Sequence, residues 1–230
     1  MRKIAVMVPT RNRPDKSKIT FDSWLQTTEG NSDFYFVLDD DNESVYPRFD
    51  NAKYIVAPRK RRGMCDATNY AAAALVNMGY EFIYWMGDDH CFRSTWETPF
   101  LEAMANQNNI GFVYGNDLLQ GRNLPTACLV SWNIIKALGY MVPPSLQHLY
   151  IDNFWLALGN NLGKIKYLDY VIIEHLHYSV GKSTHDQEYK DVNNTQMEQA
   201  DHAAYNQWIR SEGEFSLNED LKKLVNLCTE

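Results

Sequence analysis

The sequence predicts an α/β fold whose mostly parallel central sheet is flanked by helices and followed by a C-terminal helical appendage. Short runs of consecutive apolar residues alternate with helical segments, and polar residues stand where the runs end. Such runs are typical of strands buried on both faces, and their alternation with helices is typical of a doubly wound sheet. The clearest run, at 82–86, leads directly into Gly87, Asp88, Asp89 and His90.

The first half of the chain has the order βαββαβ. The predicted strands are the apolar runs at 4–8, 34–38, 53–57 and 82–86. The predicted helices cover 17–28 and 66–77 and end near Gly30 and Gly79. In open α/β sheets, ligands bind beyond the carboxyl ends of the strands, so we expect a site in the loops that follow them.

The second half continues the pattern and ends in helices. Further strands are predicted at 110–114, 127–132 and 165–173, and helices at 94–107, 132–138, 150–158, 196–210 and 216–228. Ser94 with Glu97, and Ser216 with Glu219, have the spacing of helix capping boxes. The polar stretch 180–186 predicts a mobile loop. We expect a catalytic domain over 1–182, with halves at about 1–92 and 93–182, and a helical extension over 183–230.

Composition limits the classes of function. The chain has 230 residues, 45% hydrophobic residues and a net charge of −7, which fits a globular protein and argues against a broad nucleic-acid-coating surface. Four scattered cysteines favour free thiols in a reducing compartment. No signal peptide opens the sequence and no apolar run is long enough to span a bilayer. A cytoplasmic location without an obligate protein partner is expected.

Carboxylates and histidines at strand ends suggest a cation site. Asp88 and Asp89 are adjacent, and two such carboxylates repel each other unless a cation offsets the charge. Mg²⁺ and Mn²⁺ bind through one or two carboxylates together with substrate phosphates. His175 and His177, at the end of the last strand, would point the same way if that strand continues. A solvated acidic turn and a structural histidine pair are the alternatives.

Cationic loops suggest an anion site. Arg11 and Arg13 follow the first strand, and the basic run 59–62 precedes the helix predicted from Asp66. Arginines and helix N-termini both bind phosphate groups, although a solvated basic patch is the alternative. Asp39, Asp40 and Asp41 end the second strand, where one of them can accept hydrogen bonds from a base or a ribose.

Together these ordered motifs resemble the GT-A fold of nucleotide-sugar glycosyltransferases, most nearly the family-2-type branch, over roughly residues 4–180. The resemblance rests on the segments 6–13, 37–41, 62–69, 86–90, 151–155 and 174–177. Residues 86–90 take the place of the DxD motif of that family, from which they depart because the acids are adjacent and His90 follows them. The chain also resembles the small stand-alone glycosyltransferases that phages encode.

The resemblance implies roles for individual residues. A Mn²⁺ or Mg²⁺ ion would be bound by Asp89, with Asp88 beside it, and by His177 or, as second choice, His175. Asp152 would be the catalytic base, although an Asp at a helix start is more often an N-cap. The donor-binding residues would be Pro9, Thr10, Arg11, Arg13, Asp39, Asp40, Asp41, Arg62, Gly63, Asn69, Asp88 and Lys182.

The expected function is therefore metal-dependent transfer of a sugar from a nucleoside-diphosphate sugar, with a UDP-sugar favoured, to an acceptor hydroxyl with inversion. The acceptor would be a glycan or a hydroxymethylated base in phage DNA, in which case the enzyme would act in the host cytoplasm. The alternatives are a nucleotidyltransferase, a non-catalytic nucleotide- or glycan-binding module and, as a weaker one, a metal-dependent hydrolase, since acid pairs at strand ends also suit phosphoester cleavage. The loop 9–14 lacks the glycines that nucleotidyltransferases typically place after the first strand.

Overall fold

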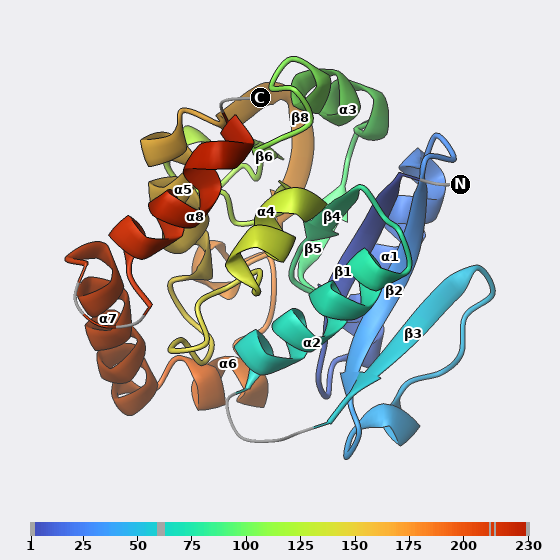
Figure 1. Cartoon of the computed structure of the whole chain (residues 1–230). Helices are drawn as coiled ribbons and strands as arrows, with labels where there is room; N and C mark the ends of the chain where they lie inside the picture. Colours follow the sequence, from blue (N-terminus) through green and yellow to red (C-terminus); the bar gives the residue numbers. More distant parts are fainter. Residues whose placement is uncertain (1–2, 59–62, 212, 214, 229–230) are drawn as a thin grey trace.

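A computed structural model describes residues 3–58, 63–211, 213 and 215–228. Its centre is one eight-stranded sheet in the order β3-β2-β1-β4-β7-β6-β8-β5 (Figure 1). The strands are β1 (Ile4–Pro9), β2 (Ser32–Asp39), β3 (Ala52–Ala57), β4 (Phe82–Trp85), β5 (His90–Phe92), β6 (Phe112–Asn116), β7 (Cys128–Ser131) and β8 (Ile165–His175). Neighbouring strands are parallel, except that β7 is antiparallel to β4 and β6, and β5 is antiparallel to β8. The predicted α/β fold with a mixed, mostly parallel sheet is confirmed.

Helices cover both faces of the sheet. They are α1 (Pro14–Thr27), α2 (Met64–Asn77), α3 (Glu97–Ala105), α4 (Trp132–Leu138), α5 (Ile151–Leu162), α6 (Gln187–Val192), α7 (Thr195–Ile209) and α8 (Leu217–Cys228). Three short 3₁₀ turns lie at Glu43–Val45, Gly121–Asn123 and Tyr178–Val180. No helix within the described ranges is both long and apolar enough to cross a membrane.

The core has two layers because β1 is buried on both faces. Ala5 and Met7 pack with α2, α4, α5 and the C-terminal helices, whereas Ile4, Val6 and Val8 pack with α1 and α3. This alternation follows from the two-residue period of a strand and explains why β1 reads as a continuous apolar run. The last two helices join the first layer through residues such as Trp208 and Leu224.

The strand order creates a switch point beside β1. The chain moves from β1 to β2 and β3 on one side, then returns to form β4 on the other side. The loops after β1, β2 and β4 therefore leave the same edge of the sheet. Ligand sites in doubly wound sheets lie at such an edge, next to the strand where the order reverses.

Two local predictions about helix caps differ from the structure. Ser94 and Glu97 form no capping box, because the buried Glu97 carboxylate accepts hydrogen bonds from the Thr28 hydroxyl (2.7 Å) and the Asn31 amide (2.8 Å). Tyr150, and not Asp152, is the N-cap of α5. The stretch 180–186 is a loop that follows the 3₁₀ turn at Tyr178–Val180 and leads into α6, and its mobility stays a prediction. Strand β5 and helix α6 were not predicted.

Candidate functional site

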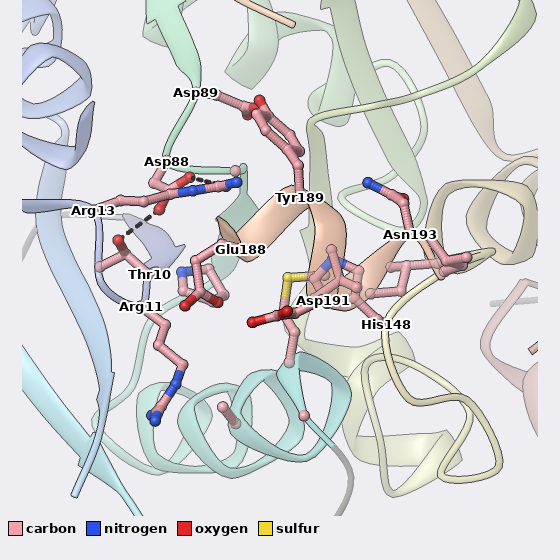
Figure 2. A pocket seen from close by; sticks show the side chains of 18 of the residues that line it. Thr10, Arg11, Arg13, Asp88, Asp89, His148, Glu188, Tyr189, Asp191 and Asn193 are labelled. Atoms are coloured by element: carbon pink, nitrogen blue, oxygen red, sulfur yellow. Dashed lines mark hydrogen bonds and ion pairs between the residues drawn. The ribbon is translucent and has the colours of Figure 1, made fainter. Parts of the chain in front are cut away.

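A cavity of about 690 Å³ opens at the carboxyl ends of β1 and β4. Most of its lining comes from the loop after β1, the segment after β4, the start of α5 with the loop before it, and helix α6 (Figure 2). His175, the last residue of β8, and His177, which follows the strand, also line the cavity. The cavity thus lies at the switch point where the sequence predicted a site.

Asp88 faces the loop after β1. Its carboxylate accepts a hydrogen bond from the Thr10 hydroxyl at 2.6 Å and pairs with the Arg13 guanidinium at 3.2 Å, as Figure 2 shows. Only 5% of Asp88 is exposed, and this burial raises the pKa of its carboxyl to about 6, against the opposing effect of Arg13. Asp88 therefore ties the segment after β4 to the loop after β1.

Asp89 faces the opposite way, toward two histidines. Its Oδ1 lies 3.1 Å from His90 Nδ1, and its Oδ2 lies 3.3 Å from His175 Nε2. Burial opposes ionisation of Asp89, but the hydrogen bonds with His175 and His90 hold its pKa well below the usual range. The rings of His90 and His175 stack with their centroids 4.2 Å apart.

These three residues form a group that fits a divalent cation. Asp89, His90 and His175 each offer a ligand atom, and these atoms all lie within 4.8 Å of one another. His175 Nδ1 is buried without a hydrogen-bond partner within the described part of the chain, 3.9 Å from the Asp117 carboxylate. One carboxylate with two imidazoles suits a transition metal such as Mn²⁺ better than Mg²⁺, which prefers oxygen ligands alone.

Backbone geometry brings the group together. In the antiparallel pair of β5 and β8, His90 stands directly opposite His175. Gly87 leaves room for Asp89, because a Cβ at Gly87 would lie 2.7 Å from Asp89 Oδ1 and 3.2 Å from His90 Nδ1. The sequence motif Gly-Asp-Asp-His thus combines a glycine that leaves room for the Asp89 carboxylate with two of the three ligand candidates.

His177 lies beside this group and outside it. Its ring centroid is 5.0 Å from that of His175, and its Nδ1 is 2.8 Å from the Ser179 hydroxyl. The strand ends at His175, so the two side chains do not continue on one face. His177 lines the cavity, and its role as a ligand remains a prediction.

The acids after β2 pair with Arg11 at the outer end of the cavity. The Arg11 guanidinium lies 2.9 Å from Asp39 and 2.6 Å from Asp41. The amide of Asp40 donates to the Ala57 carbonyl and extends the pairing of β2 with β3. Pro9, Thr10, Arg11, Arg13 and Asp39 all line the cavity, as does Gly63 at the start of α2.

The other predicted donor residues lie elsewhere. Asn69 fixes the loop before α5, because its side chain bonds the backbone of Met141 and Val142. Lys182 pairs with Glu174 at 2.7 Å and is not part of the cavity lining described for this chain. Arg62, with the rest of the basic run 59–62, falls outside the described residues.

Asp152 lines the same cavity from the first turn of α5. Its Oδ1 accepts a hydrogen bond from the Asn153 amide, and burial raises its pKa to about 6. The preceding N-cap residue Tyr150 has a left-handed backbone, with φ of 66°. A carboxylate of this pKa can accept a proton near neutral pH.

Sequence reasoning missed the contribution of α6 and of the loop before α5. Glu188, Tyr189, Asp191 and Val192 line the cavity from α6, and His148 lines it from the loop. Tyr189 donates a hydrogen bond from its hydroxyl to Asp89 Oδ2 at 2.5 Å. Helix α6 has six residues, too few for an apolar period to be recognised.

No protein-family model matches the sequence, and no curated protein matches it. Solved structures do resemble the fold. The S. aureus TarS 1–349 structure in complex with UDP-GlcNAc has 15% identity and a TM-score of 0.56, over 74% of this chain and 57% of that one. This chain thus spans less than two thirds of that TarS structure.

Two further structures extend the comparison. Glucosyl-3-phosphoglycerate synthase from Mycobacterium tuberculosis, in complex with Mn²⁺, UDP and phosphoglyceric acid, has 13% identity and a TM-score of 0.54, over 86% of this chain and 77% of that one. CMP:2-keto-3-deoxy-manno-octonic acid synthetase with CTP has 10% identity and a TM-score of 0.53, over 74% and 90%. At such identities the likeness shows the fold alone: this chain has a GT-A-like fold, shared by glycosyltransferases and nucleotidyltransferases.

Proposed function

We propose that this protein is a metal-dependent glycosyltransferase that moves a sugar from a nucleoside-diphosphate sugar to an acceptor hydroxyl. The observation that carries the proposal is the placement of two kinds of groups in one cavity. The group of Asp89, His90 and His175 lies at one wall, and the carboxylate of Asp152 lies at another. A UDP-sugar is the favoured donor, since two structural neighbours are complexes with UDP-GlcNAc and with UDP.

The proposed reaction is a single displacement with inversion. The acceptor oxygen forms a bond to the anomeric carbon, and its proton passes to the Asp152 carboxylate. The bond from the anomeric carbon to the diphosphate oxygen breaks, and its electron pair leaves with the nucleoside diphosphate. Asp152 is suited to this role because its raised pKa matches a base that works near neutral pH.

Other cavity residues would neutralise the charge of the diphosphate and hold the donor in position. Asp89, His90 and His175 would hold a divalent cation, which when bound neutralises negative charge on the leaving diphosphate. Arg13 adds positive charge, and Asp88 holds Arg13 and Thr10 in place. We propose that Arg11 and Asp39, at the outer end of the cavity, contact the nucleoside.

Product analysis tests the proposal. The protein is incubated with Mn²⁺ and a panel of nucleoside-diphosphate sugars, with glycans and with DNA that contains hydroxymethylated bases as acceptors. Release of UDP together with a glycosylated acceptor is the expected result. Release of pyrophosphate from a nucleoside triphosphate and a sugar phosphate would assign a nucleotidyltransferase, the function indicated by the neighbour that binds CTP. Nucleotide binding without any product would assign a binding module.

A further inference from the structure

Helix α6 lines the cavity, and it and its N-cap residue contact Asp89 and Arg13. Asp186, its N-cap, pairs with the Arg13 guanidinium through both carboxylate oxygens, at 2.6 and 3.0 Å, and with the Lys16 ammonium at 2.6 Å. Tyr189, one turn on, reaches Asp89 with its hydroxyl. Figure 2 shows Tyr189 projecting from α6 toward Asp89.

The contacts of Asp186 and Tyr189 resemble those that a phosphate group and a cation would make. A carboxylate that binds an arginine in a bidentate way, with a lysine beside it, presents two anionic oxygens as a phosphate group does. The Tyr189 hydroxyl takes Asp89 Oδ2, the same oxygen that faces His175 within the group that fits a cation. Side chains of this one short helix and its N-cap therefore occupy both the phosphate position on Arg13 and the cation position on Asp89.

The acids of α6 are also incompatible with a bound diphosphate. Glu188 lines the cavity and accepts a hydrogen bond from Asn12, and Asp186 pairs with Arg13, which also lines the cavity; a diphosphate on Arg13 would bring further negative charge close to both acids. Like charges at such short range repel each other strongly in a partly buried site.

The contacts of α6 with the site include ion pairs and cation–π contacts, and Tyr189 also packs on the rings of His177 and Tyr178. Tyr189, its buried residue, is held by the guanidinium of Arg13 at 4.1 Å from the ring centroid and by the Lys16 ammonium at 4.6 Å. Ion pairs and cation–π contacts of this kind are exchanged for equivalent contacts with an anionic ligand more readily than a packed apolar core is opened. An anionic ligand can therefore replace the ion pairs and cation–π contacts of the segment, whereas the ring contacts of Tyr189 must be broken.

We propose that α6 and its N-cap residue occupy the contacts of the donor site when no donor is bound. The Asp186 carboxylate takes the place of a donor phosphate on Arg13 and Lys16. The Tyr189 hydroxyl takes the place of the cation on Asp89. The inference rests on the proposed function and deepens it, because it assigns Lys16 and Arg13 to the diphosphate. A donor with its cation must displace α6 to bind, so the closed segment lowers the apparent affinity for both.

Three variants separate these contacts. Tyr189→Phe keeps the ring and its contacts with the cations but removes the hydroxyl. Asp186→Asn removes the charge but keeps a good N-cap for α6. Lys190→Ala alters an exposed residue of the same helix outside the cavity lining and serves as the matched control. Mn²⁺ binding is measured by electron paramagnetic resonance, and UDP binding in saturating Mn²⁺ is measured by calorimetry.

Tyr189→Phe is expected to bind Mn²⁺ at least about threefold more tightly than the unaltered protein, and Asp186→Asn to bind UDP at least about threefold more tightly. Lys190→Ala should bind Mn²⁺ and UDP with the same affinities as the unaltered protein. Hydrogen exchange of residues 186–192 should become faster when Mn²⁺ and UDP are added. Equal or weaker binding by the two variants, or slower exchange of 186–192, would overturn the inference and leave the proposed function standing. Failure of every protein to bind Mn²⁺ would overturn the cation site and with it both proposals.

Discussion

Asp88 and Asp89 are neighbours in sequence, but their carboxylates contact two different sets of cavity residues. Asp88 binds Thr10 and Arg13 on the loop after β1, whereas Asp89 contacts His90 and His175 beside β8. Both residues lie in the turn between β4 and β5, which the His90 amide closes with a hydrogen bond to the Gly87 carbonyl. One dipeptide thereby connects the two halves of the site, and the roles of its two acids can be separated by mutation.

Asp89→Asn should lose Mn²⁺ binding by more than about 100-fold, because it removes the only carboxylate of the three-residue group within the described chain. Asp88→Asn should keep Mn²⁺ binding within about threefold, since Asp88 is not part of that group, but it should weaken UDP binding by releasing Arg13. Titration of both variants with Mn²⁺ and then with UDP checks this division. Equal loss of Mn²⁺ binding in the two variants would contradict it.

Gly87→Ala should also impair cation binding without adding or removing a ligand. The new Cβ would lie 2.7 Å from Asp89 Oδ1, so the Asp89 carboxylate must move. We expect Mn²⁺ affinity to fall by about tenfold or more while the variant stays folded, since outer-shell changes cost metal sites about 10–100-fold. Mn²⁺ titration with a parallel melting curve makes the measurement; unchanged affinity would show that Asp89 does not need its present position.

The sequence carried enough information to predict the strands and the acids that end them. β1, β2 and β4 are buried on both faces, so their apolar runs are unbroken and Asp39 and Asp88 mark where each emerges. The site at the switch point followed from this order of elements. The likeness to solved structures supports the fold, whereas the assignment of individual site residues stays a prediction.

Other features depend on contacts between distant segments. His90 belongs to a three-residue strand whose partner, His175, lies far along the chain, so neither the strand nor the pair has a local signal. Tyr189 reaches Asp89 across 100 positions of sequence from a six-residue helix. Glu97 has the spacing of a capping residue, but its carboxylate binds the loop at 28–32 instead, since tertiary contacts override local propensity.

Activity should depend on pH through Asp152. Because burial raises the pKa of this carboxyl to about 6, it is protonated below that value and cannot accept the acceptor proton. At saturating donor, kcat should fall about tenfold per pH unit below about 6 and be level above it. Asp152→Asn should abolish transfer at every pH while UDP binding persists, and Asp169→Asn, an exposed acid of β8, is the control. Transfer retained by Asp152→Asn would remove Asp152 from the proposed mechanism.

The C-terminal helices should support the cavity through Asp201. This α7 residue is fully buried, and its carboxylate accepts hydrogen bonds from the amides of Gln147, His148 and Leu149 at 2.7–2.9 Å. These bonds fix the loop that carries His148 into the cavity lining and leads into α5. Asp201→Asn leaves one acceptor oxygen and turns an NH₂ group toward backbone donors, so it should destabilise the fold by about 2–4 kcal/mol.

Denaturant unfolding of Asp201→Asn measures that loss, with Glu198→Gln, an exposed acid of the same helix, as the control. Because the loop before Asp152 loses its anchor, kcat should fall while Mn²⁺ affinity stays unchanged, since Asp89, His90 and His175 lie on β5 and β8 and the turn before β5. A variant that loses Mn²⁺ affinity together with kcat would show that Asp201 supports the whole cavity and not the loop alone. Unchanged stability would mean that the three amides find other acceptors.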